Sequence, residues 1–157
     1  MVHIVTGSIN SGKTTKLLSL YKELKRGDGF ILPKIYIDGS FRGQQIIRLS
    51  NGTGKPFSFK MGYIPPLWDE KYSYDVYSFS MEGLDFAFDT IENIIDNSIN
   101  PVFMDEIGPL ELQEKGFYHP LAEVLSKSLS LYISVRETHL KSVIDKFRIE
   151  NYEILKV

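Results

Sequence analysis

The spacing of hydrophobic residues changes along the chain and predicts different elements in different parts. Residues Val2–Thr6 form a short, β-branched apolar run that leads into a stretch rich in glycine, serine and asparagine, which is typical of a buried strand followed by a loop. After Thr14, apolar side chains recur at the i, i+3, i+4, i+7 spacing of one helix face. They are Leu17, Leu20, Tyr21 and Leu24. Because Gly27 is a natural helix end, the chain begins with a predicted strand, a glycine loop and a helix.

From residue 30 to about residue 79, the apolar pieces are shorter and contain many aromatic residues. The pieces are Phe30–Ile37, Gln44–Leu49, Pro56–Phe59 and Tyr74–Phe79. They are separated by Asp38-Gly39, Asn51-Gly52 and Pro65-Pro66. Since Asp-Gly and Asn-Gly are strong turn signals, we expect antiparallel hairpins in this region.

Helices and strands alternate again in the second half of the chain. One predicted helix face consists of Leu84, Ala87, Phe88, Ile91, Ile94 and Ile95. The later predicted elements are a buried strand at Val102–Met104, a helix around 121–128, a strand at Leu129–Val135, a helix around 140–147 and a last strand at Tyr152–Val157. This alternation favours an α/β fold in three layers with a mainly parallel central sheet. We expect a single domain over residues 1–157, with residues 30–79 as a β-rich hairpin region inserted in it.

The composition excludes several classes of protein and site. Hydrophobic residues make up 43% of the chain and charged residues 24%, which argues against a largely disordered protein. The 18 basic and 20 acidic residues leave a net charge of −2, so charge gives no reason to expect binding to nucleic acid or to an anionic membrane. The absence of cysteine excludes disulfides, thiolate zinc sites and iron–sulfur clusters. No apolar run approaches the ~20 residues that cross a bilayer and no signal peptide is recognisable, so we expect a soluble, cytoplasmic protein.

The strongest chemical signal lies between the first predicted strand and the first predicted helix. Residues 7–14 read Gly-Ser-Ile-Asn-Ser-Gly-Lys-Thr and match G-x-x-x-x-G-K-[ST], the phosphate-binding P-loop. Its glycines let the backbone N–H groups surround a phosphate, and the following helix directs its positive end at the same anion. We expect Lys13 to reach the β- and γ-phosphate oxygens and the Thr14 hydroxyl to ligate Mg²⁺. The predicted nucleotide-binding residues are Gly7, Ser8, Ile9, Asn10, Ser11, Gly12, Lys13, Thr14 and Thr15.

An acidic pair follows the apolar strand Val102–Met104. Ligands of parallel α/β sheets bind beyond the carboxyl ends of the strands, so Asp105 and Glu106 are placed to face the P-loop. Asp105 is a candidate Mg²⁺ ligand, and Glu106 is a candidate base for a water that attacks the γ-phosphate. The alternative is that the pair only solvates the end of a strand. The intact P-loop favours the catalytic interpretation.

Arg136 follows another apolar strand and is the third candidate catalytic residue. A guanidinium group at that position could neutralise charge on a transferred phosphoryl group. The alternative is a surface salt bridge, for example with Glu137. Arg42 and Arg48 are weaker candidates. The aromatic residues of the hairpin region either form sheet core or include one or two that stack on a nucleotide base, and the sequence does not say which.

The block Asp105–Leu112, which reads DEIGPLEL, resembles the DEIGPMEL strand of a family of small P-loop nucleoside-triphosphatases, the thermophile NTPases and the animal cancer-related NTPase. The resemblance spans nearly the whole chain and implies an α/β core with an inserted hairpin region. It also implies Mg²⁺-dependent hydrolysis of ATP, GTP and other nucleoside triphosphates. Residue by residue, Gly7 to Thr15 match the phosphate cradle, Asp105 the metal carboxylate and Glu106 the water activator. Glu111 matches a family acid that either shapes the site through a salt bridge or takes part in catalysis.

The chain departs from the family pattern at three places. Leu110 replaces a methionine, and Ser8–Ser11 replaces the family's Gly-Pro-Gly or Pro-Gly loop opening. Ile31–Lys34 stands where the family has a Glu-x-Arg pattern. These departures leave the turnover rate and the base preference open.

The same residues suit two other functions. A small kinase would pass the phosphoryl group to a nucleoside or another metabolite, and the Ser-Gly-Lys-Thr-Thr run with Asp105-Glu106 is similar to dimeric thymidine kinases. A nucleotide-dependent binding module would change shape with nucleotide state and hydrolyse slowly. The unusual loop and the aromatic hairpin region favour this last alternative, although the sequence indicates no particular protein partner.

Overall fold

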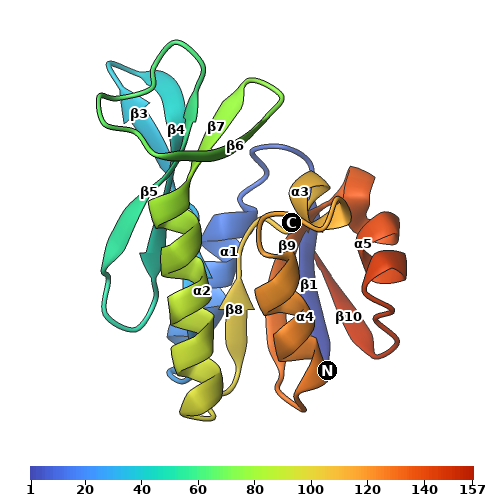
Figure 1. Ribbon diagram of the computed structural model, residues 1–157. Helices are drawn as coiled ribbons and strands as arrows, with labels where there is room; N and C mark the ends of the chain where they lie inside the picture. Colours follow the sequence, from blue (N-terminus) through green and yellow to red (C-terminus); the bar gives the residue numbers. More distant parts are fainter.

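The computed structural model describes all 157 residues of the chain. Its strands form one 10-stranded sheet with the order β10-β1-β9-β8-β2-β4-β5-β7-β6, and β3 pairs with β4 outside this path. One half of the sheet is parallel and consists of β10 (Tyr152–Lys156), β1 (Val2–Gly7), β9 (Leu131–Arg136), β8 (Val102–Met104) and β2 (Asp28–Ile31). The expected parallel central sheet is therefore confirmed (Figure 1).

The other half of the sheet is antiparallel. It begins where β2 pairs with β4 (Ser40–Arg48). The remaining strands are β3 (Lys34–Ile37), β5 (Gly54–Lys60), β6 (Glu70–Tyr74) and β7 (Tyr77–Ser80), all paired in the antiparallel direction. We call residues 34–80 the hairpin module. In Figure 1 the tips of its strands stand above the carboxyl ends of the parallel strands, at upper left.

Helices cover both faces of the parallel half. Neighbouring residues of a strand point to opposite faces, and in β1 Val5 packs with Leu17 of α1 (Lys13–Leu24), whereas Ile4 belongs to a larger cluster on the other face. That larger cluster includes side chains of α2 (Met81–Asp96), α4 (Tyr118–Ser126) and α5 (Leu140–Lys146). None of these helices combines the length and the apolar character needed to span a membrane. The three layers predicted from the alternation of elements are confirmed.

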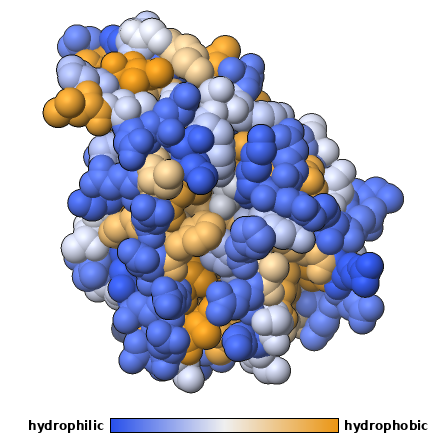
Figure 2. Space-filling view, in the orientation of Figure 1, coloured by the Kyte–Doolittle hydropathy of each residue, from blue (hydrophilic) through white to orange (hydrophobic).

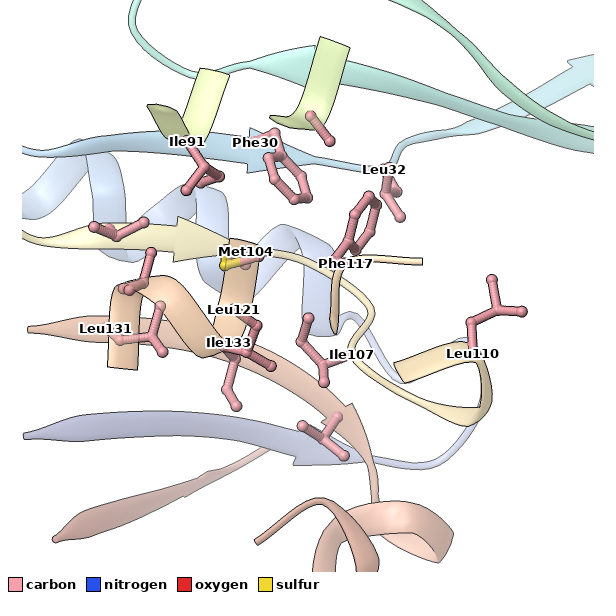
Figure 3. Packing of buried hydrophobic residues seen from close by; sticks show 14 of the residues in the cluster. Phe30, Leu32, Ile91, Met104, Ile107, Leu110, Phe117, Leu121, Leu131 and Ile133 are labelled. Atoms are coloured by element: carbon pink, nitrogen blue, oxygen red, sulfur yellow. The ribbon is translucent and has the colours of Figure 1, made fainter. Parts of the chain in front are cut away.

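The segment that follows β8 is anchored in the core between the two halves of the sheet. Its Phe117 lies against Phe30 of β2, with ring centroids 4.7 Å apart, and stacks on Phe57 of β5 at 5.2 Å. Figure 3 shows Phe30 and Phe117 close together, with Met104 and Ile107 beside them. The loop after β8 is thereby held in place, and this loop carries the acidic pair.

The structure differs from the sequence prediction in four details. The piece Phe30–Ile37 is two strands, because Pro33 has no N–H to donate and the N–H of Leu32 is bonded to a side chain. Its first part, β2, lies in the parallel half rather than in the hairpins. The piece Tyr74–Phe79 is also divided, by a turn at Asp75, whose φ is 54°. The short helix α3 (Pro109–Leu112) and the 3-10 turn Glu137–His139 were not predicted.

Candidate nucleotide site

The P-loop sequence connects β1 to α1 at the carboxyl end of the parallel strands (Figure 1). Asn10 and Gly12 adopt left-handed backbone conformations, with φ of 58° and 92°, so the chain curls between the strand and the helix. Gly7 ends the strand, and a Cβ atom there would lie 2.9 Å from the backbone carbonyl oxygen of Val157, which leaves too little room for a side chain. Because α1 begins at Lys13, its unpaired N–H groups point into the curled loop. This is the backbone geometry that an anion-binding loop requires.

Lys13 is held inside the loop rather than in solvent. Its side chain is buried, and its ammonium group donates a hydrogen bond to the Ser8 carbonyl. Burial lowers the pKa of Lys13, the negative charge of Glu106 opposes that shift, and the positive charge of Arg136 adds to it. Lys13 is therefore within electrostatic reach of both other candidate catalytic residues.

Asp105 is fully buried and connects the P-loop helix to the link between β2 and β3 and to strand β9. Its Oδ2 accepts hydrogen bonds from the Thr14 hydroxyl at 2.7 Å and from the Leu32 N–H at 2.9 Å. Its Oδ1 accepts one from the Ser134 hydroxyl of β9, the strand that separates β1 from β8. A hydroxyl and a carboxylate oxygen this close together are hard oxygen donors of the kind that Mg²⁺ takes in proteins. The residues present thus fit the predicted Mg²⁺ site.

Glu106 occupies an unusual backbone conformation at the end of β8. Its φ of 54° lies in the left-handed region, which non-glycine residues adopt rarely. The conformation is held because its N–H donates to the Ser134 hydroxyl at 2.8 Å and to Asp105 Oδ1 at 3.0 Å. Burial, together with the charge of Asp105, raises the pKa of Glu106, while Gln44 and Arg136 oppose the shift. A carboxylate with a raised pKa is a better proton acceptor than an ordinary surface glutamate.

A cavity of about 460 Å³ brings the predicted residues together. Five of them line it: Ile9, Asn10, Lys13, Glu106 and Arg136. Thr14 and Asp105 lie beside it as a bonded pair, and Thr15 is exposed on the first turn of α1. Gly7, Ser8, Ser11 and Gly12 form the loop itself. All of the predicted site residues therefore lie at one end of the sheet.

The weaker arginine candidates are not part of this cavity. Arg48 forms an ion pair at 2.7 Å with Asp28, the first residue of β2, and does not line the cavity. Arg42 stacks on Tyr63, with its guanidinium carbon 3.8 Å from the ring centroid. Arg136, by contrast, lines the cavity and forms no ion pair with Glu137. Of the three arginines, only Arg136 lies where a phosphoryl group could be contacted.

Glu111 organises the segment that follows the acidic pair. It is buried, and its two carboxylate oxygens accept hydrogen bonds from the Gly108 N–H at 2.8 Å and the Phe117 N–H at 2.9 Å. It forms no salt bridge, so that alternative was wrong. Burial raises the pKa of Glu111 to about 7 against the opposing effect of these hydrogen bonds. The side chain joins the two ends of the loop that begins at Glu106.

The sequence prediction included one or two hairpin aromatic residues as possible base contacts but identified none of the residues that the hairpin module contributes to the cavity. Lys34, Tyr36, Phe41, Gln44 and Tyr77 all line it. No local motif marks these residues, because only the pairing of strands far apart in sequence brings them to the P-loop. The sequence held one indication of this contribution: Lys34 is the last residue of Ile31–Lys34, the segment that stands in place of the family's Glu-x-Arg pattern.

Comparisons with known proteins identify the family of the chain. A family model described as NTPase matches residues 2–157. The nucleoside-triphosphatase THEP1 of Archaeoglobus fulgidus is 28% identical over 152 residues, covering 93% of this chain and 83% of the relative. THEP1 of Methanothermobacter thermautotrophicus is 25% identical over 146 residues, covering 89% and 79%.

Two solved structures share the fold. The crystal structure of THEP1 from Aquifex aeolicus has a TM-score of 0.75 and 21% identity, and the match covers 99% of this chain and 89% of that one. The solution structure of a human cancer-related nucleoside triphosphatase has a TM-score of 0.69 and 23% identity, covering 98% and 87%. The family model, which spans the chain almost end to end, shows that this protein belongs to the NTPase family, enzymes that hydrolyse nucleoside triphosphates.

Proposed function

We propose that the protein hydrolyses ATP, GTP and other nucleoside triphosphates to the diphosphate and phosphate in a Mg²⁺-dependent reaction. The observation that carries this proposal is the pairing of Thr14 with Asp105, which sets Glu106 at the edge of the same cavity that Lys13 and Arg136 line. A P-loop alone accounts for binding of the triphosphate. Hydrolysis also needs a proton acceptor, and Glu106 beside the P-loop supplies it.

The P-loop binds the phosphate chain. Backbone N–H groups of residues 7–14 and the first turn of α1 surround the β-phosphate, and the Lys13 ammonium group contacts the β- and γ-phosphate oxygens. Lys13 forms its present hydrogen bond with the Ser8 carbonyl inside the same loop, so a short side-chain movement brings it to a phosphate. These contacts hold the γ-phosphoryl group at the edge of the cavity.

Thr14 and Asp105 would hold the Mg²⁺ ion through their side-chain oxygens. When bound, the ion neutralises charge on the phosphate oxygens and so favours departure of the diphosphate. The hydrogen bond of 2.7 Å between the Thr14 hydroxyl and the Asp105 carboxylate supports this role, because it brings two oxygen ligands together.

Glu106 accepts the proton of the attacking water. Its raised pKa makes proton acceptance more favourable, and its φ of 54° fixes the direction in which the side chain leaves the strand end. Arg136, which follows Val135 at the end of β9, stabilises the negative charge that develops on the γ-phosphoryl oxygens. Both residues act only in the hydrolytic step, whereas the P-loop acts in binding as well.

A phosphate-release assay tests the proposal. Purified protein is incubated with each of ATP, GTP, CTP and UTP, with Mg²⁺ or with excess chelator, and with no phosphoryl acceptor added. We expect phosphate release from the triphosphates with Mg²⁺ and none with chelator. Release only after an acceptor such as a nucleoside is added would instead identify a kinase, and no release with any acceptor would favour the binding module.

A further inference from the structure

The cavity has an aromatic side that the proposed hydrolysis does not use. Tyr36 of β3, Phe41 of β4 and Tyr77 of β7 line it from the hairpin module. The ring centroids of Tyr36 and Phe41 are 6.0 Å apart, and those of Phe41 and Tyr77 are 6.2 Å apart. We call these three residues the aromatic wall. Three rings from three strands therefore form one continuous surface.

Tyr36 and Phe41 of the aromatic wall are not part of the hydrophobic core, whereas the partly buried Tyr77 packs against it. Phe57 and Phe79, which also reach the cavity, are 2% and 8% exposed and belong to the core cluster. Tyr36, by contrast, is 59% exposed, and Phe41 is only partly buried. Packing of the fold therefore explains Phe57 and Phe79 but not the exposed ring of Tyr36. Hydrophobic residues also gather on the surface over this upper part of the module (Figure 2).

Two lysines lie beside the Phe41 ring of the aromatic wall, and the carboxylate of Asp75 lines the cavity near Tyr77. The ammonium groups of Lys34 and Lys60 lie 5.8 Å and 6.0 Å from the centroid of the Phe41 ring. Aromatic rings bind other planar rings by stacking, and neighbouring ammonium groups attract the phosphates that accompany a nucleoside. Aromatic faces flanked by cations are thus chemically suited to a nucleotide.

The aromatic wall also faces the catalytic residues. In the sheet, β9 lies beside the P-loop strand β1 and is followed by β8, by β2 and by the strands of the module. Glu106 lies just after the end of β8. The charges of Arg136 and Glu106 both act on the pKa of Tyr77, so this ring lies within electrostatic reach of the two. A base on the wall and a phosphate on the P-loop therefore occupy the same cavity.

We propose that the aromatic wall stacks on the heteroaromatic base of a nucleotide, with Tyr36 as the main contact. The proposal rests on the proposed function, because the P-loop supplies the phosphate contact. The base comes either from the triphosphate on the P-loop or from a second nucleotide in the cavity. Since every base has an aromatic face, this site accepts purines and pyrimidines alike.

Two titrations test the base site and separate the two sources. The first measures the Kd of a non-hydrolysable ATP analogue and of inorganic tripolyphosphate, both with Mg²⁺. The second measures binding of adenosine to protein already saturated with the ATP analogue. Both are made on the wild type and on Tyr36→Ala, with Tyr36→Phe as the variant that keeps the ring and Tyr152→Ala as an exposed tyrosine remote from the cavity. Because Tyr36 is exposed, its replacement leaves the core intact.

We expect Tyr36→Ala to weaken one of the two base-dependent interactions at least about fivefold, with tripolyphosphate binding unchanged and with Tyr36→Phe and Tyr152→Ala close to the wild type. Weaker binding of the ATP analogue assigns the wall to the base of the triphosphate, and weaker binding of adenosine assigns it to a second nucleotide. The proposal is overturned if Tyr36→Ala changes neither, or if it weakens tripolyphosphate binding equally. If the wild type binds neither the analogue nor tripolyphosphate, the proposed function itself fails, and the base site fails with it.

Discussion

Asp105 is the residue at which the separate parts of the site meet. It accepts hydrogen bonds from Thr14 on the P-loop helix, Leu32 between β2 and β3, and Ser134 on β9. One buried carboxylate thus sets the relative positions of three elements. The N–H of Glu106 bonds both to Asp105 and to Ser134, so the same contacts also fix the candidate base.

Glu111 makes the stability of the protein depend on pH. Its pKa is about 7 in the folded protein and 4.5 when unperturbed, so the folded state holds this proton more tightly than the unfolded state. The contribution of Glu111 to the free energy of unfolding therefore falls as the pH rises from about 4.5 to about 7, and it stays low above that range. The loss amounts to roughly 3 kcal/mol, because each pKa unit corresponds to about 1.4 kcal/mol.

Replacing Glu111 by glutamine removes this titration. Urea unfolding of the wild type and of Glu111→Gln at pH 5 and pH 8 measures the difference between their free energies of unfolding. From pH 5 to pH 8 we expect the free energy of unfolding of the wild type to fall by about 2 to 3 kcal/mol relative to that of Glu111→Gln. Glu150→Gln, at an exposed position, is the control and shows no such change. A difference between wild type and Glu111→Gln that is the same at both pH values would contradict the assignment.

Individual side chains were predicted well where a motif defines their neighbours. Residues 7–14 and the pair Asp105–Glu106 lie next to strand ends, and the rule that ligands bind beyond the carboxyl ends of parallel strands placed them at one site. The role of Glu111 could not be predicted, because its partners are backbone N–H groups that only the folded loop brings to it.

Strand β2 joins the two halves of the sheet, and its contact with β8 depends on a glycine. Gly29 has a φ of 154°, and a Cβ atom there would lie 1.9 Å from the Phe103 carbonyl oxygen. No side chain can be accommodated unless β2 moves away from β8. Since β8 leads into Asp105, the site depends on this close approach.

We expect Gly29→Ala to lower the free energy of unfolding by at least about 2 kcal/mol more than Gly39→Ala does. Gly39 is the matched control because its φ of 75° is also positive but nothing lies within 4 Å of a Cβ there. Both variants thus introduce backbone strain, and only the first introduces a clash. Denaturant unfolding measures the two values, and equal destabilisation would show that β2 and β8 are not closely packed at this position.

Prediction of the elements depended on their length and on their turn residues. Helix α2 was recognised because six apolar positions repeat on one face, and the β3–β4 turn because it reads Asp38-Gly39. The turn at Asp75 lacks a glycine, and the short helix α3 lacks a full helical repeat of apolar residues. The sequence pattern therefore predicted neither of them. β2 was assigned to the hairpins because it lies among short aromatic pieces separated by turn signals, and its pairing with β8 of the parallel half could not be read from the sequence.

The assembled site requires both the parallel half of the sheet and the hairpin module. The P-loop, Asp105, Glu106 and Arg136 come from the parallel half, and Lys34, Gln44 and the aromatic wall come from the module. The α/β class could be predicted from alternation alone. The cavity between the halves could not, because it depends on how β2 and β4 place the module over the strand ends.

Binding of nucleotide with Mg²⁺ is expected to stabilise the protein through Asp105. At a concentration of about 100 times its Kd, a ligand that binds only the folded state adds about 2.7 kcal/mol to the free energy of unfolding. We expect a non-hydrolysable ATP analogue to raise the Tm of the wild type more with Mg²⁺ than with chelator. In Asp105→Asn this extra, Mg²⁺-dependent rise is lost.

The comparison is made within each variant, so a lower starting Tm of Asp105→Asn does not affect it. Thermal unfolding monitored by circular dichroism gives the eight midpoints, with and without the analogue for each protein and each condition. An equal Mg²⁺-dependent rise of the Tm in Asp105→Asn would show that Asp105 does not hold the metal ion.

The most direct test of the account compares binding and turnover in Glu106→Gln. Affinity for Mg²⁺-ATP and the rate of phosphate release are measured on the same preparations of the wild type, Glu106→Gln and Lys13→Ala. We predict that Glu106→Gln binds within about threefold of the wild type and releases phosphate at least about 100 times more slowly, because only proton acceptance is lost. Lys13→Ala is predicted to lose at least about tenfold in affinity as well as turnover. Phosphate release by Glu106→Gln at the wild-type rate would contradict the account.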